Sequence, residues 1–322
     1  MRRLYLERCA LALAAASMTL TAGCGASQSW LSPLSQLRPT TNESWMQPQA
    51  KTENLLYVSN GGPEDLLVFS YPNGKLVGHL KGFGRPGALC VDPAQDVWIG
   101  SQTPSDAFRF TEYGHGGTSP IRVVVDSDYG IDCAVDPTTG NLTAINFSGA
   151  ESSEPGNVTV YNSSAAGLPR MYQDSSLMFY QSGVYDNEGN LFVVGDDQDY
   201  TPMLGELPHG ETKFVNFSIK KYVSNVTDGV LWDGSNVVVS EQVGGSEAIL
   251  YRFSVSGSSI TPKGKVQLGD EFDTRLFIAG ARVIGGDLEN SVLYWDYPKG
   301  YGSTKISKDV SEPVAVAVSL VP

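Results

Sequence analysis

The stretch that decides the fold is Cys133-Ala134-Val135-Asp136-Pro137-Thr138-Thr139-Gly140-Asn141-Leu142-Thr143-Ala144-Ile145. An apolar run ends in Asp, a short turn carries Gly and Asn, and a second apolar run follows. The same pattern surrounds Asp92, Asp186 and Asp233, so the four Asp residues stand 44, 50 and 47 positions apart. A period of about 40–50 residues is typical of a four-stranded propeller blade.

Each unit can be completed with two further strands. The third strands are rich in apolar and aromatic residues and lie at 66–72, 107–110, 158–161, 203–207, 249–253 and 292–298; fourth strands such as 121–125 and 264–268 follow. Short apolar runs between Gly, Pro, Asn and Asp turns indicate β-strands. No stretch after the N-terminal segment keeps a helical period for three turns. The sequence therefore predicts an all-β, six-bladed β-propeller with four-stranded antiparallel blades and almost no helix.

The two ends of the chain predict how the ring closes. Residues 55–60 have the pattern of a second strand that lacks a first strand, and residues 313–320 that of a first strand without followers. Pairing of these segments completes the sixth blade and leaves no free sheet edge at the seam. An ordinary β-sandwich and two small β-domains are the alternatives, and both would leave the two half-units unpaired.

The N-terminal segment has the features of an export signal. Arg2, Arg3 and Arg8 precede an apolar run at 10–20, which is too short to span a membrane. The following Leu20-Thr21-Ala22-Gly23-Cys24 resembles a bacterial lipobox, although Thr21 stands where Leu is commoner. The resemblance implies that Cys24 is lipidated. A plain signal peptide with a chance Cys is the alternative.

These features predict three parts of the chain. We expect a lipoprotein signal peptide at 1–23, a flexible tether rich in Ser, Gln, Pro and Thr at 24–52, and the propeller at 53–322. A second strand begins at the face that carries the turns between first and second strands. Because the tether leads into such a strand, we expect it to leave the propeller from that face.

Two of the four cysteines belong to the propeller. Cys90 and Cys133 lie in the first strands of consecutive blades, two and three residues before their repeat Asp. Opposite parity puts them on opposite faces of their sheets, and neighbouring blades stack opposite faces together. In an oxidising compartment a disulfide is one expectation. Two small buried thiols are the other.

The charge is strongly negative and unevenly distributed. A formal net charge of −13 argues against nucleic-acid binding, which needs clusters of Lys and Arg. Acidic residues concentrate in the loops that join second to third strands and one blade to the next, which share one face of a propeller. This acidic face is expected to include Asp126, Asp128, Asp132, Asp196, Asp197, Asp199, Asp270, Glu271 and Asp273, against the few cations Arg85, Lys220, Lys221, Arg275 and Lys308. Such a surface attracts cations and cationic ligands; charge that only keeps loops soluble is the alternative.

The repeat resembles the NHL and YVTN-type β-propellers of exported bacterial proteins over about residues 53–322. Tyr57-Val58-Ser59-Asn60 is close to the Tyr-Val-Thr-Asn of the second type, and residues 135–142 and 185–191 have the Val-Asp-x-x-x-Gly-Asn-Leu style of the first. The resemblance implies binding of a small molecule, peptide or protein rather than catalysis. We expect an exported, monomeric binding module without a cofactor, held to a bacterial membrane only through its lipid.

A more distant resemblance is to the sugar lactonases of the SMP-30/gluconolactonase type, whose six-bladed ring holds one divalent metal ion. The segment 227–233 looks like that family's Asp-Gly segment, which would make Asp228 the metal-bound general base. Glu312-Pro313-Val314 is similar to the family's Glu-Gly-Pro-Val, but Phe179 stands where its Asn ligand is expected. The alternative function is therefore a lactonase-like hydrolase that uses Ca²⁺ or another divalent cation at Asp228 and Glu312, with one ligand missing.

Overall fold

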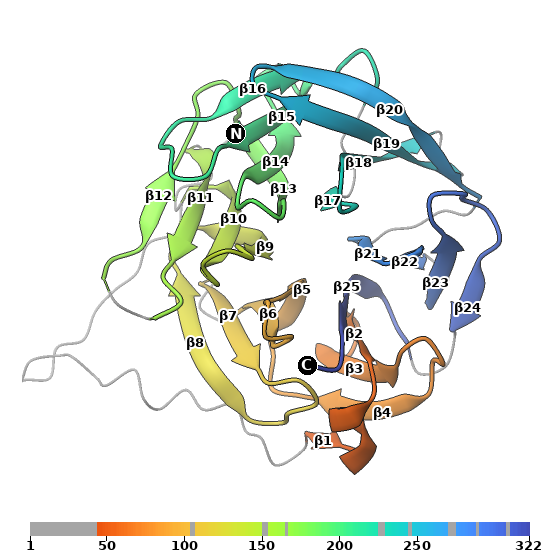
Figure 1. Ribbon diagram of the computed structural model, residues 1–322. Helices are drawn as coiled ribbons and strands as arrows, with labels where there is room; N and C mark the ends of the chain where they lie inside the picture. The colour runs from red at the N-terminus through yellow and green to blue at the C-terminus, as the bar shows by residue number, and fades with distance from the viewer. Residues whose placement is uncertain are drawn as a thin grey trace, which may run out of the picture. The chain divides into compact units, whose positions relative to one another are not determined.

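Six antiparallel sheets stand as blades around a central axis in the computed structural model of this protein (Figure 1). The structure describes residues 44–103, 107–149, 154–164, 167–224, 229–243, 247–269, 275–287, 290–306 and 310–322. All of them belong to one compact unit, Pro39–Pro322. The prediction of an all-β, six-bladed propeller is confirmed.

Five blades are formed by consecutive strands, which follow one another from the innermost to the outermost. Blade 1 contains β5 (Arg85–Val91), β6 (Val97–Gln102), β7 (Phe108–Tyr113) and β8 (Pro120–Asp126). Blade 2 contains β9 (Tyr129–Val135), β10 (Leu142–Ser148), β11 (Pro155–Tyr161) and β12 (Arg170–Tyr172). Blade 3 contains β13 (Phe179–Tyr185), β14 (Leu191–Asp196), β15 (Pro202–Leu207) and β16 (Val215–Ser218). Blade 4 contains β17 (Val230–Trp232), β18 (Val237–Val243), β19 (Glu247–Ser256) and β20 (Ser259–Leu268), and blade 5 contains β21 (Phe277–Ala279), β22 (Arg282–Asp287), β23 (Ser291–Asp296) and β24 (Thr304–Ile306).

Blade 6 is built from segments far apart in the sequence. Its strands are β25 (Pro313–Ser319), β2 (Leu55–Asn60), β3 (Asp65–Ser70), β4 (Leu76–Leu80) and β1 (Trp45–Met46). β25 pairs with β2, so that Leu55 lies opposite Ser319 and Tyr57 opposite Ala317. The predicted closure of the ring is confirmed. This blade has five strands, one more than the predicted four.

The folded part of the chain begins before residue 53, so the predicted end of the tether at residue 52 is wrong. β1 pairs with β4, with Trp45 opposite His79. The short 3₁₀ helix η3 (Pro48–Thr52) follows and buries Ala50 completely. Without β1, β4 would be an edge strand with unpaired backbone groups. The gain from pairing with these groups outweighs the polar composition of the segment, which favours a flexible tether.

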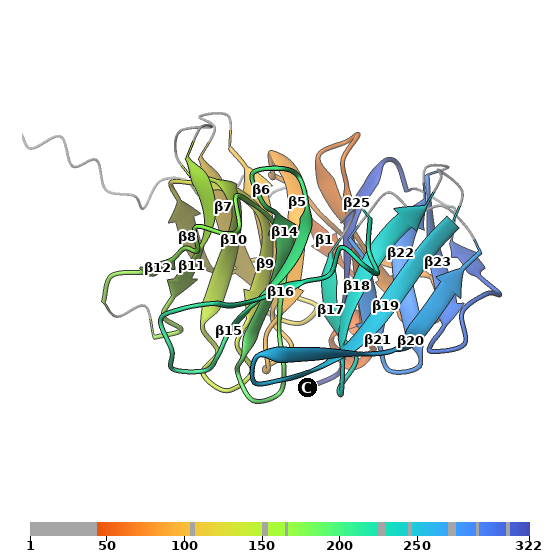
Figure 2. The same ribbon diagram turned by 90° about the horizontal axis from the view of Figure 1, so that it is seen from above.

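The strands of each blade run between two faces of the ring, as the side view shows (Figure 2). β4 ends at the acidic face, and β1 is antiparallel to it. The backbone N–H of Lys81, just beyond β4, donates to the Ser44 hydroxyl at 3.0 Å. Residue 44 therefore lies at the acidic-face end of blade 6. The expectation that the chain enters from the opposite face is wrong, because β1 first crosses the outer edge of the blade.

The core is divided into clusters between neighbouring blades. One cluster joins blades 4 and 5 and contains the fully buried Trp295 with Val238 and Leu250. Another joins blades 1 and 2 and contains Trp98 and Phe110. Each buried side chain of this size contributes about 1.5–3 kcal/mol of transfer free energy. Because every cluster needs two blades, stability depends on the complete ring. Within the described residues no helix has the length and apolar character needed to cross a membrane.

Cys90 of β5 and Cys133 of β9 are joined by a disulfide in the structure, with their Cα atoms 5.8 Å apart. The two residues are 7% and 4% exposed and lie inside the cluster between blades 1 and 2. The opposite parity of the two positions thus brings the sulfur atoms to one interface. Their sequence separation is 43 residues.

We expect the disulfide to form in an oxidising compartment, where it would constrain the unfolded chain. For a loop of this length, reduction should lower the free energy of unfolding by up to about 4 kcal/mol. Non-reducing peptide mapping by mass spectrometry should recover Cys90 and Cys133 in one linked fragment. The double variant Cys90→Ala/Cys133→Ala is the control and should unfold identically with and without reductant. Recovery of two separate alkylated thiols would contradict the expectation.

Candidate functional site

A central cavity of about 270 Å³ is lined by residues of the six innermost strands. Its lining is polar toward the acidic face, where Asp132, Ser182 and Arg275 lie. Toward the opposite face the lining is largely apolar and includes Val135 and Leu231. The blades are arranged around the axis on which this cavity lies (Figure 1), and we call the polar end of the cavity its mouth.

Arg275 spans this mouth. It stands just before β21, and its backbone N–H donates to the carbonyl oxygen of Val314 at 3.1 Å. Its guanidinium donates from Nη1 to the carbonyl of Gly87 at 3.2 Å and from Nη2 to that of Gln181 at 3.1 Å. Its Nε lies 3.2 Å from Oδ1 of Asp132, an ion pair. One residue of blade 5 thus contacts blades 1, 2, 3 and 6.

Asp132 extends the network to the remaining blade. Its Oδ2 accepts hydrogen bonds from the Ser182 hydroxyl at 2.7 Å and from the backbone N–H of Gly183 at 3.3 Å. The Ser182 oxygen in turn accepts the backbone N–H of Val230, in blade 4, at 3.2 Å. Asp132 is only 5% exposed. All six blades are therefore connected through one polar network at the mouth, which we call the mouth network.

The mouth network pairs most of its polar groups, although the buried Nε of Arg275 contacts Asp132 as an ion pair without a hydrogen bond. Both oxygens of Asp132 have partners, and the Ser182 hydroxyl both donates and accepts. A buried charge is tolerated when its partner and hydrogen bonds are in place. Asp132 and Ser182 are therefore engaged as structural groups rather than as a general base or a nucleophile. A metal ion at Asp132 would lie beside the positive charge of Arg275.

Of the residues considered for the lactonase site, the structure describes Glu312 and Phe179. Asp228 lies outside the described residues. Glu312 is exposed, in the left-handed region with φ of 50°, and its backbone N–H donates to Oδ1 of Asn290 at 2.8 Å. Phe179, at the position of the expected Asn ligand, stacks on Phe147 with ring centroids 5.2 Å apart. That position carries an aromatic platform instead of a metal ligand.

The residues predicted for the acidic face divide into buried and accessible ones. Asp126 is 1% exposed, and it accepts hydrogen bonds from the backbone N–H of Asp128 at 2.9 Å and from the Tyr161 hydroxyl at 3.0 Å. Burial raises the pKa of Asp126. With Asp132, it is a structural group rather than a surface charge. Asp196, Asp197 and Asp199 come at and after the end of β14, while Cys24, Asp270, Glu271 and Asp273 lie outside the described residues.

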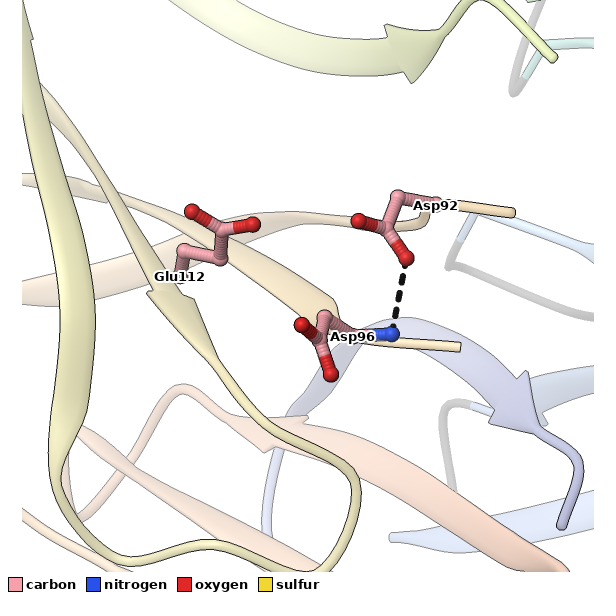
Figure 3. A group of neighbouring side chains, drawn as sticks. All are labelled: Asp92, Asp96 and Glu112. Carbon is pink, nitrogen blue, oxygen red and sulfur yellow. Dashed lines mark hydrogen bonds between the residues drawn. The ribbon is translucent and has the colours of Figure 1, made fainter. Parts of the chain in front are cut away.

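Three carboxylates converge on the opposite face, in blade 1 (Figure 3). Asp92 and Asp96 flank the turn between β5 and β6, and Glu112 lies in β7; one oxygen of each lies within 4.8 Å of the others. Burial raises the pKa of Asp92 and of Glu112, and repulsion from the neighbouring carboxylates adds to it. The Nε of Arg122, 3.5 Å from Glu112 Oε2, offsets part of the charge. Carboxylate oxygens are the ligands that Ca²⁺ prefers, so within the described residues this cluster has the donor set for a divalent cation.

Blade 1 departs from the repeat at Asp96. In blade 3 the equivalent residue is Asn190, whose Nδ2 donates to Oδ2 of Asp186 at 2.7 Å. The Oδ1 atoms of Asn190 and of Asp96 both accept a backbone N–H from the turn after the third strand, at 2.9 and 3.2 Å. An ionised carboxylate has no proton to donate to Asp92. Asp96 thus keeps the backbone hydrogen bond to the anchoring Asp and one of the two side-chain contacts of the repeat, and it replaces the other side-chain contact with repulsion.

Arg275→Ala should lower the free energy of unfolding by about 3 kcal/mol, because it leaves Asp132 as a buried charge without its ion-pair partner. Urea unfolding measures the change. Adding Asp132→Asn in the same chain removes that charge and should recover part of the loss. The exposed Arg85 gives the matched control, Arg85→Ala. Equal stability of the Arg275→Ala and Arg85→Ala proteins would contradict the role assigned to the mouth network.

Asp96→Asn should stabilise the protein by about 1 kcal/mol at pH 7, since it supplies one hydrogen bond and removes one charge. The raised pKa values of Asp92 and Glu112 mean that the folded state binds protons more readily than the unfolded chain. Their repulsion therefore destabilises the fold at neutral pH and fades as the pH falls toward about 4. Thermal unfolding of both proteins across this range should show the gain shrinking on acidification. A gain that grows on acidification would refute this account.

No model of a known family matches the chain, and no curated protein matches its sequence. Several solved structures are similar in fold. TolB from Acinetobacter baumannii is 11% identical with a TM-score of 0.61, over 84% of this chain and 67% of TolB. A protein of unknown function from Bacteroides caccae is 10% identical with a TM-score of 0.56, over 83% of this chain and 99% of that one. A putative 6-phosphogluconolactonase from Bacteroides fragilis is 11% identical with a TM-score of 0.51, over 84% of this chain and 99% of that one. At these identities the similarity shows the propeller fold alone.

Proposed function

We propose that this chain is a non-catalytic binding module of the bacterial cell envelope, held to a membrane by a lipid on Cys24. The lipobox-like segment supports the export and the anchor. The propeller supplies a rigid ring whose two faces differ in charge. Its ligand is a small molecule, peptide or protein that is recognised on the acidic face, and the module acts as a monomer.

The observation that carries this proposal is the mouth network. In a catalytic mouth an acid, base or metal ligand must be available to the substrate. Here the carboxylate of Asp132 is paired with Arg275, and the Ser182 hydroxyl is held by hydrogen bonds on both sides. The polar groups of the mouth hold the blades together, which favours binding at the surrounding surface over chemistry inside the channel.

The fold neighbours include both a TolB and putative 6-phosphogluconolactonases. The likeness in fold is therefore compatible with the proposed binding module and with the lactonase alternative. The lactonase alternative needs a cation near Asp228 and Glu312, in a ring whose mouth already holds a guanidinium. Hydrolysis of sugar lactones by the purified protein in Ca²⁺, Zn²⁺ or Mn²⁺ would contradict the proposed binding function. Stabilisation by a cation without turnover would instead indicate a structural metal, for which the carboxylate cluster of blade 1 is the first candidate.

The anchor is tested by metabolic labelling. Cells that produce the protein should incorporate radiolabelled palmitate into it, and Cys24→Ala should abolish the label because the thiol that carries the lipid is gone. Cys9→Ala is the matched control within the N-terminal segment and should leave the label unchanged. Label that persists in the Cys24→Ala protein would overturn the anchor.

A further inference from the structure

Three aromatic rings form a continuous stack on the acidic face. Phe147 at the end of β10 and Phe179 at the start of β13 have centroids 5.2 Å apart and an interplanar angle of 25°. Phe179 and Tyr200, in the loop between β14 and β15, are 5.3 Å apart at 10°. The stack crosses from blade 2 to blade 3. Tyr200 is 72% exposed, so the outer face of the last ring is open to solvent.

The loop that carries Tyr200 is held in an unfavourable conformation. Tyr200 has φ of 57°, a left-handed value that a bulky residue rarely adopts. The backbone N–H of Tyr200 donates to the carbonyl of Asp197 at 3.0 Å, and Oδ1 of Asp197 accepts the N–H groups of Asp199 at 2.8 Å and Thr201 at 2.9 Å. A conformation of this kind persists only where the surrounding structure fixes it, and here the hydrogen bonds of Asp197 hold the loop.

Three carboxylates lie near Tyr200 in the sequence, at and after the end of β14. The backbone N–H of Thr201 and, more weakly, that of Asp199 lower the pKa of Asp197, so this carboxylate is ionised at neutral pH, with a smaller contribution from Lys220. Oδ2 of Asp196 accepts a hydrogen bond from Nε2 of Gln181 at 2.7 Å. Asp199 is exposed beside Tyr200 in the sequence. Negative charge next to an aromatic face is complementary to a cation that can also stack.

The neighbouring mouth network already holds a guanidinium on this face. The guanidinium of Arg275 is held there by Asp132 and by the carbonyl of Gln181, the residue whose side chain binds Asp196. A guanidinium is planar, stacks on aromatic rings and pairs with carboxylates in a fixed geometry, whereas an ammonium group is a compact, strongly hydrated point charge. Membranes and nucleic acids are anionic and would be repelled by this surface.

We propose that the stack of Phe147, Phe179 and Tyr200, together with Asp197 and Asp199, is a subsite for an arginine side chain on a polypeptide partner. The guanidinium stacks on the open face of Tyr200 and is paired by the carboxylates of the loop. This inference rests on the proposed binding function and names the chemistry of its partner. Phe147 and Phe179 act as the support that fixes the Tyr200 ring.

The test uses the full-length protein in detergent and capped peptides with two Arg residues separated by Gly, with binding measured by calorimetry. Tyr200→Leu and Asp199→Asn should each weaken binding about 2- to 5-fold, the effect expected for an exposed cation–π or ion-pair contact. Tyr200→Phe keeps the ring and should bind as the wild type does. Replacing Arg by citrulline, which is planar but neutral, should abolish binding, and Lys should weaken it.

The opposite face offers matched controls. Tyr301 is 56% exposed with φ of 51°, and Asp296 is exposed in β23. Tyr301→Leu and Asp296→Asn remove the same side-chain groups, and change the net charge by the same amount, as Tyr200→Leu and Asp199→Asn. They should leave the affinity for the arginine peptides unchanged. Equal losses at both faces, unchanged affinity in Tyr200→Leu, or equal binding of the citrulline peptide would overturn the subsite. Binding of spermidine with the same dependence on Tyr200, without binding of the arginine peptides, would also overturn it in favour of a free polyamine.

The subsite can fail without the proposed function failing. Envelope proteins captured equally by the wild type and by Tyr200→Leu would exclude the subsite and leave the binding module intact. Turnover of a lactone would exclude the non-catalytic function, whatever the peptides do. The subsite requires that Tyr200→Leu and Asp199→Asn selectively weaken the binding of arginine peptides. The thermal unfolding of both variants should be unchanged.

Discussion

The pairing of β25 with β2 is the interaction on which the rest of this structure depends. It joins segments about 250 residues apart and is reinforced at its acidic-face end, where the Ser59 hydroxyl accepts the backbone N–H of Ala315 at 2.8 Å. Each hydrophobic cluster lies between two blades. Opening of the ring would therefore expose the two apolar surfaces that face each other at the opened interface. The same pairing positions Val314 for Arg275 and thereby fixes the mouth network. Closure is therefore a condition for both the core and the polar centre.

The mouth network answers a packing problem that ring closure creates. Six innermost strands converge on an axis that their short side chains do not fill, and the remaining space is polar at one end. Arg275 is long enough to reach several blades, and it brings donors to carbonyl groups that would otherwise be buried without partners. The ion pair with Asp132 adds little net stability by itself, because desolvation of both charges offsets the attraction. Its value lies in specifying how the blades meet.

The sequence predicted the features that recur from blade to blade, but it could not predict the contacts that occur only once in the ring. Spacing of the Asp residues, apolar runs and half-units at both ends was enough for the six blades and for their closure, because each blade repeats one local pattern. The parity of Cys90 and Cys133 predicted their shared interface for the same reason. Arg275 was counted only as one of a few cations on the acidic face, since its partners lie 39 to 188 residues away and carry no local signal. β1 was assigned to the tether because edge pairing with β4 is a tertiary effect that the Ser-, Gln-, Pro- and Thr-rich composition of the whole segment does not encode.

In a ring of similar blades, the positions that break the repeat are the most informative about function. In blades 3 and 4 an Asn side chain donates to the anchoring Asp, and blade 1 has Asp96 in its place, at a cost in repulsion. Asp126 and Asp132 look like rim charges in the sequence but are buried supports, whereas Asp197 is half-buried and Asp199 is exposed. That same loop holds an exposed aromatic ring in a strained conformation. An open ring that stacks on two other rings, beside an ionised carboxylate, has no role in the core, so we explain it by a ligand rather than by the fold.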